Sequence, residues 1–205
     1  MKKLTFLLTA LLAAASGSAK VTLPKMFADG MVMQREADAN LWGRADASAT
    51  VKITTSWDNK TYTVKAGADG KWKTSVRTPE AGGPYKITLT DGQETVLDNI
   101  LIGELWICSG QSNMEMPMKG FKNQPVEGAV EDILHSTDPQ LRLFTVKRNS
   151  KITPVDTVSG QWSEACPASV REFSATAYYF GRELRRMLGV RGMDEGRLAE
   201  GLPRR

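Results

Sequence analysis

The chain has 205 residues, enough for one large or two small domains that each bury a core. Its 41% hydrophobic and 24% charged residues are typical of a globular protein and exclude a disordered or fibrous chain. The formal net charge is +4, but Lys and Arg are scattered among acidic residues, so we expect a solvated surface and no nucleic-acid partner.

Residues 1–19 have the layout of a secretory signal peptide. Two lysines precede an apolar stretch from Leu4 to Ala15, and small residues follow up to Ala19, after which we expect cleavage. No later segment has the roughly 20 apolar residues that a membrane helix requires. We therefore expect a periplasmic or secreted protein with no membrane segment after cleavage. Cys108 and Cys166 could pair there or remain thiols, and the sequence leaves both open.

Apolar side chains recur with a period of two over residues 20–100, which predicts β-strands. The alternating runs lie at 49–56, 60–65, 71–76 and 85–90. Turn signals separate them at Asp58-Asn59, Asp69-Gly70, Gly82-Gly83-Pro84 and Asp91-Gly92. Short antiparallel strands of this kind predict an all-β sandwich domain over residues 20–100. This half of the chain shows no catalytic constellation.

The pattern changes after Leu101. Leu105 to Cys108 are continuously apolar, which predicts a strand that is buried on both faces, as in a parallel sheet flanked by helices. A helix is expected over 125–136, a strand over 141–146, and a second helix from Ser174 to Leu188 that ends at Gly189. This order is the start of an α/β domain of flavodoxin-like type, so the whole chain is expected to be mixed.

Ser112 follows the apolar run, in the segment GELWICSGQSNMEMPM at 103–118. A strand that ends in a tight turn, allowed by Gly110, would expose the Ser112 hydroxyl at the carboxyl edge of the sheet. Backbone N–H groups would then face the oxyanion that forms when a serine attacks a carbonyl. The alternative is a plain polar loop after a buried strand, which is the more frequent case for an isolated serine.

The segment GELWICSGQSNMEMPM closely resembles the first block of the sialate O-acetylesterase family, in the SGNH hydrolase superfamily, where the serine of GQSN is the nucleophile. LPKMFADGMVMQR and LWGRAD resemble the family's N-terminal sandwich segment, and FSATAYYFGRELRRMLGV resembles its helix before the second sheet strand. The resemblance runs from about Leu23 to Val190. It implies a β-sandwich followed by the N-terminal part of an SGNH hydrolase domain at 101–190, with 191–205 as a non-matching tail.

The resemblance also implies an activity. It predicts an exported carbohydrate esterase that uses Ser112, without cofactor or metal, to remove O-acetyl groups from sialic acids or other acetylated glycans. In the family, an oxyanion asparagine and an Asp-x-x-His that carries the base lie further along the chain, and neither follows Val190 here. We therefore expect a fragment that lacks the catalytic His and Asp and is inactive alone. The alternative is a non-catalytic carbohydrate-binding or adaptor module whose working part is the sandwich.

One literal Asp-x-x-His is present, at Asp132 to His135. In the family this motif follows the last strand, whereas here it lies on the first expected helix. We interpret His135 as a surface histidine near a helix C-terminus, out of hydrogen-bond reach of Ser112. Neither zinc nor phosphate-loop spacing occurs, so no cofactor is expected.

The remaining candidates are interpreted as packing or surface residues. Met114, Met116 and Met118 would form a flexible apolar lip beside Ser112, and Glu115 would be an exposed loop residue. Tryptophans dispersed through a sandwich domain are more often core residues than sugar platforms. That interpretation covers Trp42, Trp57, Trp72, Trp106 and Trp162.

Overall fold

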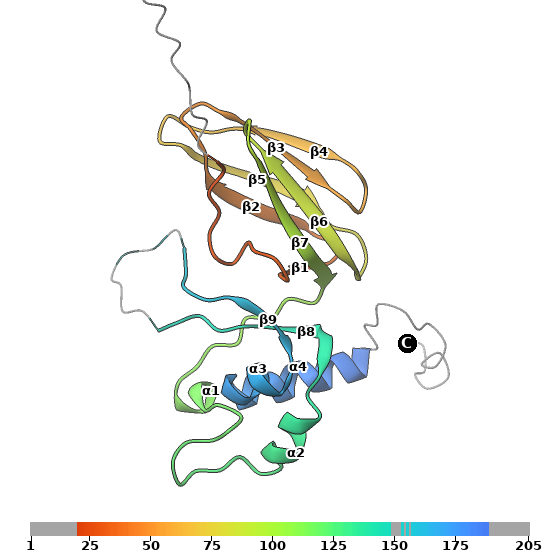
Figure 1. The fold of residues 1–205 in the computed structure, drawn as a ribbon, viewed down its shortest axis with the longest axis vertical. Helices are drawn as coiled ribbons and strands as arrows, with labels where there is room; N and C mark the ends of the chain where they lie inside the picture. Colours follow the sequence, from red (N-terminus) through yellow and green to blue (C-terminus); the bar gives the residue numbers. More distant parts are fainter. Residues whose placement is uncertain (1–19, 149–152, 154, 156, 189–205) are drawn as a thin grey trace, which may run out of the picture.

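The protein is mixed α/β and mostly sheet in the computed structural model, which describes residues 20–148, 153, 155 and 157–188 (Figure 1). The predicted signal peptide, Gly189 and the tail at 191–205 lie outside the described residues. In chain order the elements are β1 (Val32–Gln34), β2 (Asp38–Arg44), β3 (Thr50–Thr55), β4 (Thr61–Lys65), β5 (Lys71–Arg77), β6 (Gly82–Thr90), β7 (Glu94–Gly103), α1 (Ser112–Glu115), α2 (Ala129–Leu134), β8 (Asp138–Phe144), β9 (Trp162–Ala165), α3 (Pro167–Glu172) and α4 (Ala175–Leu188).

Residues 20–103 form two sheets, here called the β body. One sheet has the strand order β1-β7-β6-β3-β4, and the other pairs β2 with β5. The β1–β7 pair is parallel and the other pairs are antiparallel. Most apolar side chains of the predicted alternating runs are buried in one apolar core, whereas Tyr62, Val64 and Tyr85 are only partly buried against it. The buried side chains include Val51, Ile53, Trp72, Val76, Ile87 and Leu89.

Three of the four predicted turns lie between strands, and the fourth is wrong. Gly82, Gly83 and Pro84 belong to β6, where the pairing with β7 shifts register between Gly82 and Tyr85. The chain between β5 and β6 is residues 78–81, directly before these glycines. Gly83 has a φ of 125°, so its conformational freedom serves an irregular strand rather than a chain reversal.

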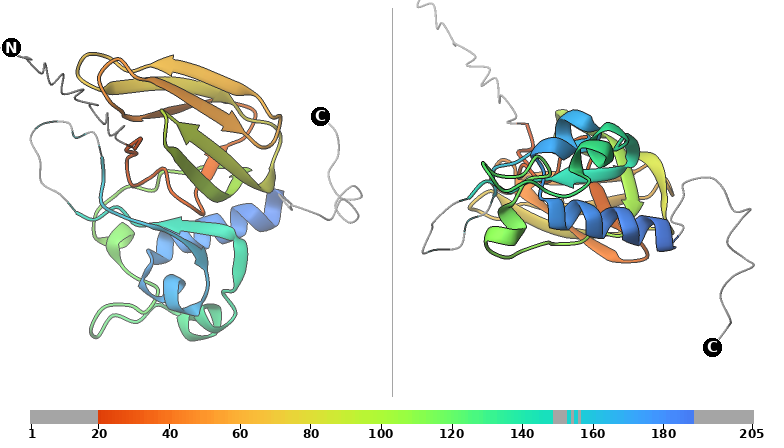
Figure 2. Two further views of the ribbon diagram at one scale, coloured as in Figure 1. Left: turned by 45° about the horizontal axis from the view of Figure 1, so that its top comes forward. Right: turned by 90° about the horizontal axis from the view of Figure 1, so that it is seen from below.

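The described residues from 104 to 188 form the helical body, in which α1 to α4 lie mainly on the side of the antiparallel pair β8–β9 that faces away from the β body (Figures 1 and 2). The predicted helix at Ser174–Leu188 is confirmed as α4, and the strand expected at 141–146 overlaps β8. The helix expected at 125–136 is only the six residues of α2, because Gly128 is left-handed at its N-cap. Two of its apolar residues, Val130 and Leu134, are exposed.

The predicted buried strand at Leu105 to Cys108 is wrong. Residues 104–110 leave β7 as open chain, and Ile107 is 92% exposed. A strand requires neighbours for its N–H and C=O groups, and in the described part of the chain the strands after residue 103 pair only with each other. Trp106 instead meets the Phe180 ring of α4 edge-on, with the ring centroids 5.3 Å apart.

Arg142 of β8 joins the helical body to the β body. Its side chain is only 4% exposed, and Nη2 lies 3.0 Å from Asn99 Oδ1 and 3.2 Å from Glu164 Oε1. Nη1 donates to the Gly30 carbonyl at 3.4 Å, and a Cβ on Gly30 would lie 3.0 Å from that nitrogen. Burial lowers the pKa of Arg142, and the nearby carboxylate of Glu164 opposes this.

A second polar contact crosses the same interface. The Trp162 indole N–H donates to the Met26 carbonyl at 2.8 Å, so β9 is fixed to the β body next to β8. Both contacts involve partly buried groups that would lose hydrogen bonds if the two bodies separated.

We expect Arg142→Ala to lower the free energy of unfolding by about 2 kcal/mol, because it leaves the Gly30 carbonyl and the Asn99 amide oxygen, which are buried or partly buried in the β body, without this donor. Arg186→Ala is the matched control. Arg186 pairs with Glu183 on the surface and is 71% exposed, so about 0–0.5 kcal/mol is expected. Urea unfolding of both variants measures the difference, and equal small losses would contradict the role given to Arg142.

Candidate active site

Ser112 is the first residue of α1 and is exposed. Its N-cap is Gln111, whose carbonyl accepts the N–H groups of Met114 and Glu115 at 2.9 and 3.0 Å. The backbone N–H groups of Ser112 and Asn113 and the Ser112 hydroxyl make no hydrogen bond among the described residues. The hydroxyl and two backbone donors are thus open to a substrate.

The segment at 112–118 is held by the α3–α4 junction. Ala175 N–H donates to the Met116 carbonyl at 2.8 Å, and Met118 N–H donates to the Phe173 carbonyl at 2.9 Å. The Thr176 hydroxyl donates to the Asn113 carbonyl at 3.1 Å, directly beside Ser112. The backbone at the serine is therefore positioned by residues about sixty positions further along the chain.

Sequence reasoning did not find the positioning role of Ser174 and Thr176. The Ser174 hydroxyl lies 3.4 Å from Met114 Sδ and caps α4 by accepting the Ala177 N–H at 3.3 Å. Both residues stand in FSATAYYF, one of the segments that carries the family resemblance. The signal that could have identified them is the pair of hydroxyl residues at the start of the helix predicted from Ser174.

Glycine is needed at position 110 because Met114 packs closely against it, and not because of an unusual backbone angle. Its φ is outside the left-handed region, but a Cβ there would lie 3.1 Å from the Met114 Cβ. Because Gly110 has no side chain, Met114 of α1 can pack directly against residue 110. The predicted turn before Ser112 therefore requires glycine for its small size.

The three methionines do not form one lip. Met118 is fully buried in the core of the helical body, whereas Met114 and Met116 are half-buried beside Ser112. Glu115 is exposed, as predicted, but ends α1 and forms an ion pair with Arg148. Of the three methionines, Met114 and Met116 can thus line the approach of a substrate to Ser112, and Met118 cannot.

The structure places His135 away from Ser112. His135 is the C-cap of α2, and its Nδ1 lies 3.0 Å from the Glu131 carbonyl and 3.2 Å from the Glu131 carboxylate. Helices α1 and α2 stand apart in all three views (Figures 1 and 2). His135 is a surface residue at a helix end, as the sequence predicted.

Asp132 serves packing. The Tyr179 hydroxyl donates to its Oδ2 at 2.7 Å, and Arg182 donates to its Oδ1 at 2.5 Å, so the carboxylate ties α2 to α4. The hydrogen bond from Tyr179 is the main cause that lowers the pKa of Asp132; burial opposes it, and Arg182 adds to it. Burial and the same hydrogen bond raise the pKa of Tyr179 to about 12.

Both cysteines are free thiols in the structure. Cys108 is exposed, and Cys166 caps α3, where hydrogen bonds with Ser169 lower the pKa of its thiol. Among the described residues no group of three or more His, Cys, Asp or Glu could hold a metal ion. Nor does this part of the chain contain a helix with the length and apolarity needed to cross a membrane.

Four of the five tryptophans pack against the β body as interpreted. Trp72 is buried, and Trp42, Trp57 and Trp162 are partly buried against the same core. Trp106 is the exception, because it is 56% exposed in the open segment before Ser112.

The fold matches that of a solved enzyme. A carbohydrate acetylesterase from Xanthomonas citri is 35% identical, and its crystal structure superposes with a TM-score of 0.76 over 82% of this chain and 38% of that one. The chain is thus similar in fold, and identical at about a third of the aligned positions, to part of a carbohydrate acetylesterase. No family model matches it.

The curated relatives that match the chain are sialate O-acetylesterases. Sialate O-acetylesterase from Rattus norvegicus is 28% identical over 172 residues, and that from Homo sapiens is 27% identical over 174 residues. Each match covers 75% of this chain but only 31% and 32% of the relatives, so the chain spans about a third of their length. The resemblance to the sialate O-acetylesterase family is thereby confirmed.

We expect Tyr179→Phe to destabilise the protein by about 1 kcal/mol at pH 7. Asp132 has a lowered pKa in the folded state, so its contribution is present above the unfolded-state pKa and is lost as pH falls through the folded-state pKa. The difference from wild type should therefore shrink as the pH is lowered from 7 toward 3. Urea unfolding across that range measures it.

Tyr85→Phe is the matched control, because it removes a phenol hydroxyl from the β body, away from Asp132. Its effect should not depend on pH in that range. A pH-independent loss in Tyr179→Phe would contradict the assigned hydrogen bond.

Proposed function

We propose that the chain is the N-terminal part of an exported serine esterase that removes O-acetyl groups from glycans, with Ser112 as the nucleophile. One observation carries the proposal: an exposed Ser112 hydroxyl at the first residue of α1, beside two backbone N–H groups without partners among the described residues. A nucleophile and oxyanion donors on one short turn are what acyl transfer from an ester requires.

In the proposed reaction, Ser112 Oγ attacks the acetyl carbonyl and gives its proton to a base. The Ser112 N–H donates to the oxyanion of the tetrahedral intermediate. Collapse of the intermediate releases the sugar hydroxyl, which takes the proton, and leaves an acetyl ester on Ser112. Water, activated by the same base, then releases acetate and restores the serine.

The base and its orienting carboxylate are proposed to lie in the part of the relatives that this chain does not span. The contacts of His135 with Glu131 and of Asp132 with Tyr179 and Arg182 support this, because both side chains already have other partners. The 205-residue chain should therefore be a poor esterase or none.

The substrate proposal rests on the relatives. Their names specify sialate O-acetyl groups or acetylated carbohydrate, so we propose an O-acetylated sialic acid or another acetylated glycan. The two packed sheets support a β-sandwich for residues 20–100, and the serine segment supports the opening of an SGNH-type α/β domain at 101–190. Export is proposed from the composition of residues 1–19.

The test uses a protein in which this chain continues into the segment that its relatives have beyond it. Ser112→Ala should lower kcat/KM for an aryl acetate by at least about a thousandfold, without loss of stability. Ser109→Ala changes an exposed serine of the same segment and should leave the rate nearly unchanged. Activity that persists in Ser112→Ala contradicts the mechanism.

The 205-residue chain is assayed alongside. Acetate release close to the uncatalysed rate is expected, since one triad member alone supplies little catalysis. Enzyme-like turnover by the chain alone would show that base and carboxylate lie within it and would overturn their proposed location.

A further inference from the structure

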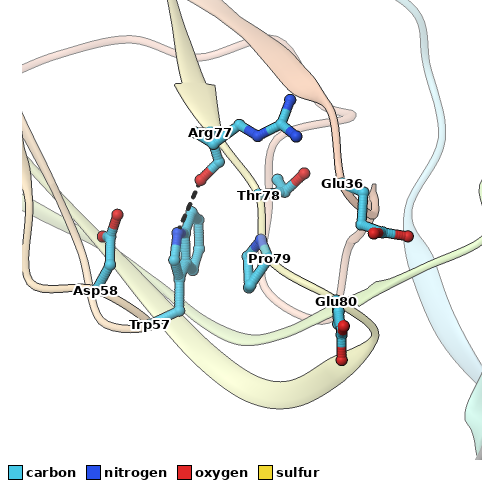
Figure 3. A pocket seen from close by; sticks show the side chains of 7 residues that line it. All are labelled: Glu36, Trp57, Asp58, Arg77, Thr78, Pro79 and Glu80. Carbon is cyan, nitrogen blue, oxygen red and sulfur yellow. Dashed lines mark hydrogen bonds between the residues drawn. The ribbon is translucent and has the colours of Figure 1, made fainter.

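An open hollow lies at one end of the β body, separate from Ser112 (Figure 3). Its lining comes from three connections that meet there and from the end of β5: Glu36 between β1 and β2, Trp57 and Asp58 between β3 and β4, Arg77 at the end of β5, and residues 78–80 between β5 and β6. None of these side chains is used by the proposed esterase reaction, and the sequence assigned Trp57 only a packing role.

The floor of the hollow is rigid. Thr78 is buried, its hydroxyl lies 2.7 Å from the Gln34 carbonyl, and it accepts the Ala37 N–H at 2.9 Å. Glu36 N–H donates to the Pro79 carbonyl at 2.9 Å, which locks the β1–β2 turn to the β5–β6 connection. The backbone that carries the lining residues is therefore held before any ligand arrives.

Trp57 is fixed in the same way. Its indole N–H donates to the Arg77 carbonyl at 3.0 Å, and its ring meets Tyr85 edge-on with centroids 5.7 Å apart. The side chain is only half-buried, and it faces the hollow beside Pro79 in Figure 3. A held aromatic ring at an opening presents an apolar surface at low entropic cost.

Polar groups surround this ring. The carboxylates of Glu36 and Glu80 make no hydrogen bond or ion pair among the described residues, so they are available as acceptors. Arg77 is 57% exposed, with Asp38 3.8 Å from its Nη1, and most of its donors stay open. Asp58 is held by the Thr55 hydroxyl at 2.6 Å and closes one side.

We propose that this hollow is an accessory binding site for a neutral hexopyranose unit of a glycan chain. One face of such a ring carries only C–H groups and can cover the Trp57 indole, while its hydroxyls donate to Glu36 and Glu80 and accept from Arg77. The proposal does not require Ser112 to be catalytic, so either can fail without the other.

The charges of the lining decide against other ligands. Lys60 Nζ lies 3.5 Å from the Asp58 carboxylate and pairs with it, which leaves the carboxylates of Glu36 and Glu80 beside a single guanidinium. This net negative charge repels an anionic sugar such as a sialic acid. The three carboxylates do not converge on a metal position, since no ligating group of three is present in the described part of the chain. A basic peptide remains the rival ligand, and the experiment separates it.

The test is affinity electrophoresis of the 205-residue chain in native gels that contain galactomannan, xyloglucan or hydroxyethylcellulose. Retardation by at least one polysaccharide is expected. Trp57→Ala should weaken it about tenfold, as loss of an aromatic contact of about 1.4 kcal/mol would. Trp106→Ala, which removes an exposed tryptophan elsewhere, should bind like wild type.

Glu80→Gln keeps the fold intact, because this side chain has no partner to lose in the described structure, and should weaken binding severalfold. Glu94→Gln, an exposed change on β7, is its control. Free N-acetylneuraminic acid should not compete. The proposal is overturned if none of the three polysaccharides retards wild type, if Trp57→Ala and Trp106→Ala behave alike, or if only a lysine-rich peptide binds in a Trp57-dependent way.

Discussion

The buried guanidinium of Arg142 is the interaction on which the arrangement of the two bodies depends. It carries a charge into an interface where its side chain is 4% exposed, and such a charge is tolerated only when its donors are satisfied. Asn99, Gly30 and Glu164 satisfy them from both sides. Gly30 has no side chain that could block the approach.

Strand β8, which Arg142 fixes to the β body, also positions Ser112 through its contacts with α4. Arg185 of α4 forms an ion pair with Asp138 at the start of β8, so helix and strand move together. The first turn of α4 then holds α1 through the bond from Ala175 to Met116. Ser112 therefore has a defined backbone even though the chain before it, residues 104–110, is open. The serine is positioned from its C-terminal side.

Hydrophobic periodicity in the sequence predicted the strands and the long helix whose formation depends on local side-chain pattern. Alternation identified the buried faces of β3, β5 and β6, and helical spacing with a terminal glycine located α4 within one residue. The same method failed at Leu105 to Cys108, because an apolar run specifies burial but cannot supply the neighbouring strands that pairing needs. It also placed a turn at Gly82–Pro84, where a strand irregularity uses the same residues.

The candidate active site could be predicted from the sequence to a smaller extent than the fold. Ser112 stood out only through the family resemblance, since an isolated serine in a polar loop has no distinguishing pattern. Thr176 and Asn113 meet across 63 positions, and Arg142 meets Asn99 across 43, so neither contact leaves a periodic trace. By contrast, position on a helix sufficed to exclude Asp132 and His135 from a triad, and their contacts agree.

The central claim is that Ser112 carries the acetyl group during turnover, and mapping the acyl-enzyme tests it most directly. The protein extended by its relatives' C-terminal segment is mixed with an aryl acetate, quenched in acid during the first turnover, digested and analysed by mass spectrometry. The account predicts a single acetyl group, located on Ser112 and absent from Ser112→Ala. Turnover with the acetyl group on another residue, or with no acetylated peptide at any quench time, would contradict it.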